Sequence, residues 1–150
     1  MVGGMAVDVL TEIEIARPRD EVAAYAGDVD NTTSWYENIS SVEWETAPPL
    51  AVGSRIAFAA RFLGRSLSYT YEVLELVPGE RLVMRTADGP FPMETTYTWS
   101  DAGAGATRMT LRNRGEPSGF GKVGAPLMAR SVERANRRDL ARLKQILESA

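Results

Sequence analysis

Tyrosines at alternating positions are the side chains of this sequence that could take part in a reaction. Tyr69, Tyr71 and Tyr97 stand in stretches whose apolar residues recur at every second position, and Thr95 and Asn113 occupy matching positions. A tyrosine can donate a hydrogen bond to a carbonyl, but its ordinary pKa of about 10 makes it a poor base without a cationic neighbour. No charged strand residue is expected on the same face, so the pattern favours binding over acid–base catalysis.

The groups that most often carry catalysis or bind metals are missing. The sequence has no Cys and no His, which removes thiolate nucleophiles, Cys/His zinc sites and imidazole bases. Its carboxylates have no metal-ligand spacing, and the glycines at 103–106 lack the Lys-Ser/Thr ending of a phosphate loop. Ser118, in a stretch with glycines at 119 and 121, lacks a base partner. We therefore expect no catalytic residue, no metal and no cofactor.

The charge is small and uneven. The formal net charge of −3 over 150 residues gives no reason to expect a nucleic-acid partner. From Phe120 onward, however, seven Lys and Arg residues stand against three Asp and Glu residues. Arg130, Arg134, Arg137 and Arg138 are expected on a solvated helix face, and the alternative is a surface that docks a partner.

No segment has the properties of a targeting or membrane sequence. Residues 1–7 lack a charged start and a long apolar run, which argues against a signal peptide. No stretch approaches about 18 consecutive apolar residues, so no membrane-spanning segment is expected. The sequence predicts a single cytoplasmic domain over residues 1–150.

Two kinds of pattern must position these side chains. From Met128 to the end, a helical stripe of apolar residues alternates with basic residues on the other side, and Pro126 either starts this helix or kinks it. The stripe consists of Met128, Ala129, Val132, Leu140, Leu143, Ile146 and Leu147. Seven stretches have strand periodicity, at 7–15, 41–45, 56–62, 66–73, 82–86, 93–100 and 107–114.

Short connections complete the predicted layout. Pro18 and the acidic residues after it predict one short helix, and a cap-rich stretch at 28–33 predicts a second. Gly64 and Arg65 are expected to form a two-residue hairpin turn. Hairpin links of this length indicate an antiparallel sheet, whose concave face must be covered by the long helix.

The order of these elements, and of the turn and helix-cap residues between them, resembles that of the START-like, or SRPBCC, superfamily, especially its bacterial polyketide cyclase/dehydrase branch. The matching pieces are Pro18–Val22, Asp28 with Asn31 and Trp35, Val52–Ser54, Gly64–Arg65, Tyr71–Val73, Pro78–Leu82, Gly105–Thr107, Leu143–Lys144 and Leu147–Glu148. The resemblance implies an α+β helix-grip fold, in which a seven-stranded antiparallel sheet wraps around a long C-terminal helix and two short helices lie between strands 1 and 2. Its members differ in function, so it implies a fold more specifically than an activity.

Helix-grip proteins usually enclose a cavity, and the inward faces define its expected lining. The alternative is a filled core, because aromatic residues at strand spacing more often pack against one another. The candidate ligand-binding residues are Trp35, Tyr36, Phe58, Phe62, Tyr69, Tyr71, Met84, Phe91, Tyr97, Trp99, Met109, Leu111, Met128, Val132 and Asn136.

The function that follows is the binding or transport of a hydrophobic small molecule, lipid-like or aromatic and polyketide-like. A first alternative is an aromatase/cyclase-type enzyme that folds a polyketide chain into a reactive conformer, with tyrosines polarising its carbonyls. A second alternative is a protein-interaction module that uses the basic helix face. The sequence leaves the oligomeric state open, a dimer included.

Overall fold

A computed structural model describes residues 6–116 and 124–150 of the chain. Ser118, the glycines beside it and the first residues of the chain therefore lie outside the described parts. The elements run in the order β1 (Val7–Ile15), α1 (Arg19–Ala26), the 3-10 helix η1 (Val29–Asn31), α2 (Thr32–Trp35), β2 (Ile39–Trp44), β3 (Arg55–Phe62), β4 (Arg65–Val77), β5 (Arg81–Asp88), β6 (Met93–Asp101), β7 (Thr107–Gly115) and α3 (Ala125–Ser149).

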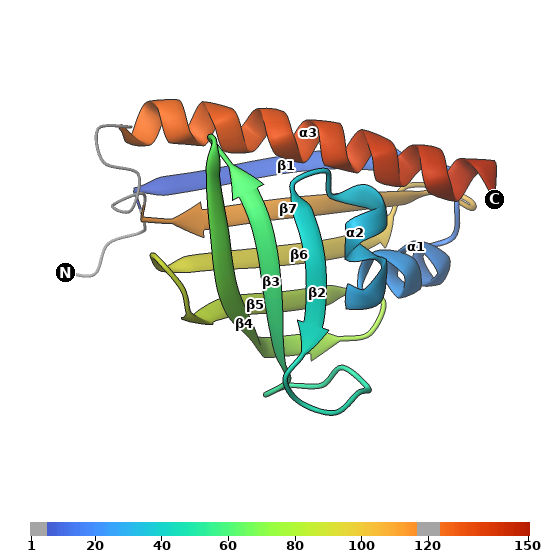
Figure 1. Ribbon diagram of the computed structural model, residues 1–150. Helices are drawn as coiled ribbons and strands as arrows, with labels where there is room; N and C mark the ends of the chain where they lie inside the picture. Colours follow the sequence, from blue (N-terminus) through green and yellow to red (C-terminus); the bar gives the residue numbers. More distant parts are fainter. Residues whose placement is uncertain (1–5, 117–123) are drawn as a thin grey trace.

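The seven strands form one antiparallel sheet in the order β1-β7-β6-β5-β4-β3-β2. Each strand from β2 to β7 pairs with its neighbour in sequence, and β1 closes against β7. The sheet curves around α3, which lies along β1, while α1 and α2 fill the end of the sheet near the C-terminus (Figure 1). The predicted helix-grip fold is confirmed.

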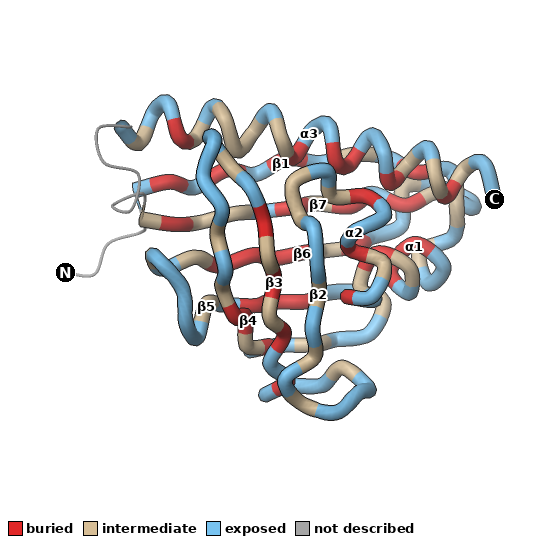
Figure 2. Tube along the Cα trace, in the orientation of Figure 1, coloured by how far each residue is buried: buried red, intermediate tan, exposed pale blue. Residues whose placement is uncertain are grey.

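The long helix places its apolar stripe on the sheet and its arginines in solvent. Pro126 stands in the first turn of α3, where its missing N–H costs nothing, so it starts the helix rather than kinking it. Leu140, Leu143 and Leu147 are buried in the core. Buried and exposed residues alternate along α3 in Figure 2. All four arginines predicted to be exposed are exposed: Arg130, Arg134, Arg137 and Arg138.

The turn between β3 and β4 differs from the prediction by one residue. Phe62 pairs with Arg65, so the two turn residues are Leu63 and Gly64 rather than Gly64 and Arg65. Both have positive φ, 51° for Leu63 and 76° for Gly64, as a tight hairpin turn with right-handed strand twist requires. Gly64 correctly indicated the position of the turn, but the register of β3 and β4 determines that the other turn residue is Leu63 and not Arg65.

The two short helices close one end of the sheet. Pro18 precedes α1, and the side chain of Asp28 accepts a hydrogen bond from the N–H of Asp30 at the start of η1. Trp35, the last residue of α2, is 1% exposed and belongs to the core. Among the described residues, no helix is both long and apolar enough to cross a bilayer.

Candidate functional site

A cavity of about 160 Å³ lies between the concave face of the sheet and α3. Its walls come from β3, β4, β5 and β6 on the sheet, from α2 at one end, and from Met128, Val132 and Asn136 on the helix. A space needs only about 10–15 Å³ to admit a water molecule, so this one is far larger than a packing defect. The prediction of a cavity rather than a filled core is therefore confirmed.

Eleven of the fifteen candidate binding residues line this cavity. They are Tyr36, Phe58, Phe62, Tyr69, Tyr71, Met84, Phe91, Tyr97, Met128, Val132 and Asn136. The aromatic members from the sheet touch one another. The ring centroids of Phe58 and Tyr69 lie 5.6 Å apart in a stacked arrangement, and those of Tyr69 and Tyr71 lie 5.2 Å apart edge to face. These contacts make a rigid apolar wall.

The other four candidates, Trp35, Trp99, Met109 and Leu111, do not line the cavity. They pack into the solid part of the core, in one cluster with Leu140, Leu143 and Leu147 of the C-terminal half of α3. Met109 and Leu111 are 0% exposed. The C-terminal half of α3 buries Leu140, Leu143 and Leu147 in the same cluster as these four residues, whereas Met128, Val132 and Asn136 of its N-terminal half line the cavity.

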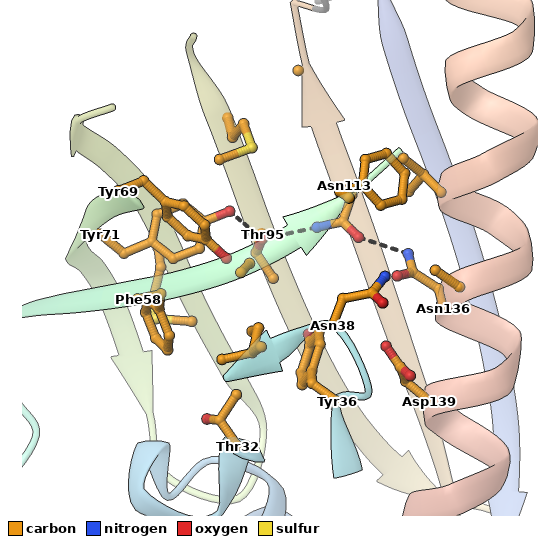
Figure 3. A pocket seen from close by; sticks show the side chains of 18 of the residues that line it. Thr32, Tyr36, Asn38, Phe58, Tyr69, Tyr71, Thr95, Asn113, Asn136 and Asp139 are labelled. Atoms are coloured by element: carbon orange, nitrogen blue, oxygen red, sulfur yellow. Dashed lines mark hydrogen bonds between the residues drawn. The ribbon is translucent and has the colours of Figure 1, made fainter. Parts of the chain in front are cut away.

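A chain of hydrogen bonds crosses the cavity from the sheet to the helix (Figure 3). The Tyr71 hydroxyl lies 2.8 Å from Thr95 Oγ1, and the Asn113 Nδ2 donates to the same Thr95 oxygen at 2.8 Å. Asn136 on α3 then donates through Nδ2 to Asn113 Oδ1 at 2.6 Å. The chain links β4, β6, β7 and α3, so it fixes the helix against the sheet while satisfying buried polar groups.

The tyrosines of the cavity are held neutral. The hydroxyls of Tyr36 and Tyr97 lie 2.7 Å apart, and burial is the main cause that raises the pKa of each above its ordinary value. Burial also raises the pKa of Tyr69, and it raises that of Tyr71 to about 12. Among the described residues no cation lowers these pKa values, so these side chains can donate hydrogen bonds but cannot serve as bases near neutral pH.

This state predicts that the tyrosines of the cavity ionise only when the protein unfolds. In the folded protein at about pH 11, four of the five tyrosines, Tyr36, Tyr69, Tyr71 and Tyr97, should remain protonated, because their pKa values lie above the ordinary value of 10. Phenolate absorbance near ~295 nm should rise to its full five-tyrosine amplitude only when the protein unfolds. Full amplitude at this pH in a protein that is still folded would contradict the description.

A buried carboxylate also faces the cavity, contrary to the expectation of an uncharged lining. Asp139 is 2% exposed and lines the space beside Tyr36 and Asn136. Its Oδ1 accepts the Glu37 N–H at 3.2 Å and a longer bond from Arg138 Nε at 3.4 Å. Burial raises the pKa of Asp139, and these two donors oppose the increase.

From its place near the edge of the helical stripe, Asp139 could meet Arg17 or Arg114 or face water, and the sequence favours a structural ion pair. Neither of these two arginines is its partner. Arg17 donates to the carbonyls of Glu148 and Ala150, and Arg114 pairs with Glu94 and Asp8. The predicted structural ion pair exists, but its partner is the neighbouring Arg138. Asp139 could have been recognised from its spacing, because it stands three residues after Asn136 and one before Leu140 on the buried stripe.

Several residues of the rim and end walls are not among the fifteen candidates. Thr32, Asn38, Leu67, Met93, Arg114 and Glu116 all line the cavity. Asn38 stands just before β2, and Arg114 and Glu116 stand at the end of β7, where strand periodicity stops giving a direction for the side chain. Only Met93 and Leu67 carried a usable signal, since both continue the alternation of apolar residues.

A second hollow of about 360 Å³ lies on the other side of the wall formed by Asn38, Phe62 and Ala135, which line both spaces. It is lined by Arg61, Arg134 and Arg138 as well. Arg138 is paired with Glu37 and Asp139, and Arg61 donates to the Ser66 hydroxyl. Part of the basic helix face therefore borders the cavity wall instead of facing solvent alone.

Solved structures of the same architecture come from several bacteria. A START superfamily protein from Mycobacterium smegmatis matches with a TM-score of 0.81 and 14% identity, covering 95% of this chain and 97% of that one. The Zhui aromatase/cyclase from Streptomyces sp. R1128 matches with a TM-score of 0.76 and 18% identity over 94% and 93% of the two chains. The protein TTHA0849 from Thermus thermophilus matches with a TM-score of 0.74 and 20% identity over 95% and 99%.

These identities establish a shared fold. No curated protein sequence matches this chain. Residues 6–148, almost the whole chain, match the family described as polyketide cyclase/dehydrase and lipid transport. With the helix-grip fold and the cavity between sheet and helix, this match shows that the chain belongs to the polyketide cyclase/dehydrase and lipid transport family.

Proposed function

We propose that the cavity between the sheet and α3 binds a small, mostly apolar molecule about the size of one aromatic ring. The observation that carries the proposal is the cavity of about 160 Å³, whose walls are mainly aromatic and aliphatic side chains. An engineered apolar cavity of about 150 Å³ binds benzene, so a space of this size accepts one ring.

The polar groups of the cavity suit recognition better than catalysis. Tyr71, Thr95, Asn113 and Asn136 already bond to one another, which holds them in place. The tyrosines are neutral donors, and the one carboxylate among the described cavity residues that lies deep in the wall, Asp139, already accepts two hydrogen bonds. A general base needs a free, correctly placed acceptor with a tuned pKa.

A cyclase remains the second candidate, and it rests on Tyr69. Among the described residues the Tyr69 hydroxyl makes no hydrogen bond, although the ring lines the cavity, so it is free to polarise a bound carbonyl. The Zhui aromatase/cyclase has the same fold, which makes this chemistry worth testing. In such an enzyme the cavity would hold the chain folded, and the hydroxyl would stabilise a developing enolate.

Replacing single tyrosines by phenylalanine separates the two candidates. If Tyr69, Tyr71 and Tyr97 only line a binding pocket, each Tyr→Phe change should shift ligand binding by about 0.5–1.5 kcal/mol, the net value of one hydrogen bond. If one of them donates a proton, the same change should leave binding intact and lower turnover by ~10²-fold or more. The assay incubates the wild type and each variant with poly-β-keto mimics and looks for cyclised product.

The identity of the natural ligand is best sought in the freshly purified protein. Native mass spectrometry should show a mass increment that disappears on denaturation and corresponds to a small apolar molecule. A protein purified without any such molecule should instead bind added one-ring compounds with one-to-one stoichiometry. Failure of both experiments would contradict the proposed function.

A further inference from the structure

Three polar side chains stand together where α3 passes the start of β2: Asn38, Asn136 and Asp139 (Figure 3). Asn136 and Asp139 are three residues apart on α3, so they share one face of the helix. Both are almost fully buried, with exposed fractions of 4% and 2%. All three line the cavity, whose other walls are mainly apolar.

These side chains have acceptor atoms that the rest of the protein does not use. Asn136 donates its Nδ2 to Asn113, and Asp139 accepts its two bonds through Oδ1. Within residues 6–116 and 124–150, no donor reaches Asn136 Oδ1, Asp139 Oδ2 or the side-chain amide of Asn38. These atoms open onto the cavity rather than being sealed in the core, so the O–H group of a ligand can donate to them.

The negative charge of Asp139 determines which polar group of a ligand this part of the cavity can bind. A hydroxyl placed against Asp139 would form a charge-assisted hydrogen bond, which is stronger than a neutral one. A carboxylate in the same place would meet the negative charge of Asp139 in a low-dielectric space. Its oxygens would face two acceptors, Asp139 Oδ2 and Asn136 Oδ1, and only the Asn38 amide could donate to them. Arg138 does not change this selection, because its guanidinium is already shared by Asp139 and Glu37.

We propose that Asn38, Asn136 and Asp139 form a hydroxyl-binding subsite, so that the ligand of this cavity is a neutral, hydroxylated ring compound rather than a carboxylic acid. The ring lies against Phe58, Tyr69 and Met84 on the sheet, and the hydroxyl points to the helix. The inference rests on the proposed function, since it assumes that the cavity takes an apolar guest.

Three one-ring probes that share the methylphenyl group test the subsite: toluene, p-cresol and 4-methylbenzoate, each titrated into the full-length protein by calorimetry. We expect p-cresol to bind about tenfold or more tightly than toluene, even though its hydroxyl must first leave water. The carboxylate should bind about tenfold or more weakly than p-cresol. Equal affinities for toluene and p-cresol, or tightest binding of 4-methylbenzoate, would overturn the subsite but leave apolar binding in place. Absence of binding by all three would instead contradict the proposed function.

Two variants and one control test whether the preference for p-cresol over toluene comes from the polar residues on α3. Asp139→Asn keeps the shape and an oxygen for the Glu37 N–H, and it should remove most of the preference for p-cresol over toluene. Glu133→Gln removes the same charge from an ion pair on the outside of α3 and should leave the preference unchanged. If Asp139→Asn does not fold, Asn136→Leu provides the second test, because it removes an acceptor without changing charge. A preference for p-cresol that survives in the variant that folds would contradict the assignment.

Discussion

Replacing Ala60 by phenylalanine is expected to abolish the binding of one-ring probes, with a loss of affinity of about tenfold or more. Ala60 lies on β3 between Phe58 and Phe62 on the cavity side of the sheet, and it is 8% exposed. A benzyl group on its Cβ would occupy the space that a bound ring needs. Calorimetric titration with toluene measures the loss, and thermal unfolding checks that the variant is folded.

The adjacent residue supplies a matched control. Ala59 lies on the opposite face of the same strand, where it pairs with Ser68 and Ser41. Ala59→Phe adds the same group outside the cavity, so toluene binding should be unchanged. If both variants bind like the wild type, the cavity is not the binding site, and the basic helix face becomes the surface to examine for a protein partner.

Replacing Leu143 by alanine is expected to lower the free energy of unfolding by about 2–5 kcal/mol, the usual cost of deleting a large core side chain. Leu143 is 0% exposed and belongs to the cluster that joins α3 to the sheet beside Met109 and Leu111. The loss includes both the apolar surface returned to water and the void that remains. Urea denaturation measures this difference.

A leucine at the other end of the same helix is the control. Leu127 is 55% exposed, so Leu127→Ala should change the free energy of unfolding by no more than about 0.5 kcal/mol. Similar costs for the two variants would mean that the C-terminal half of α3 is not the part of the helix that holds the sheet.

The fold could be predicted because each element carries its own signal. The alternation of Val7, Val9 and Thr11 against exposed residues reappears as buried and exposed positions in β1. The stripe through Leu140, Leu143 and Leu147 likewise reappears as the buried face of α3. Such patterns depend only on the period of one element, which the sequence displays directly.

The site was less predictable, because it depends on how far two elements stand apart. Met109 and Tyr97 have equal inward patterns, yet one is sealed under the helix and the other faces the cavity. Only the position of α3 above the sheet separates them. Asn38 illustrates a second limit, since it stands outside any regular element and its direction is set by the chain turning from α2 into β2.

Methionine methyl groups can report directly on whether the space between the sheet and α3 admits a small apolar molecule. Met84, Met93 and Met128 line the cavity, whereas Met109 is sealed in the core. In protein labelled with 13C at the methionine methyls, titration with toluene should shift the signals of Met84, Met93 and Met128 saturably, with one common affinity, and leave that of Met109 nearly unchanged. If the signals of Met84, Met93 and Met128 do not respond, or if they drift without saturation together with that of Met109, the space does not admit such a molecule.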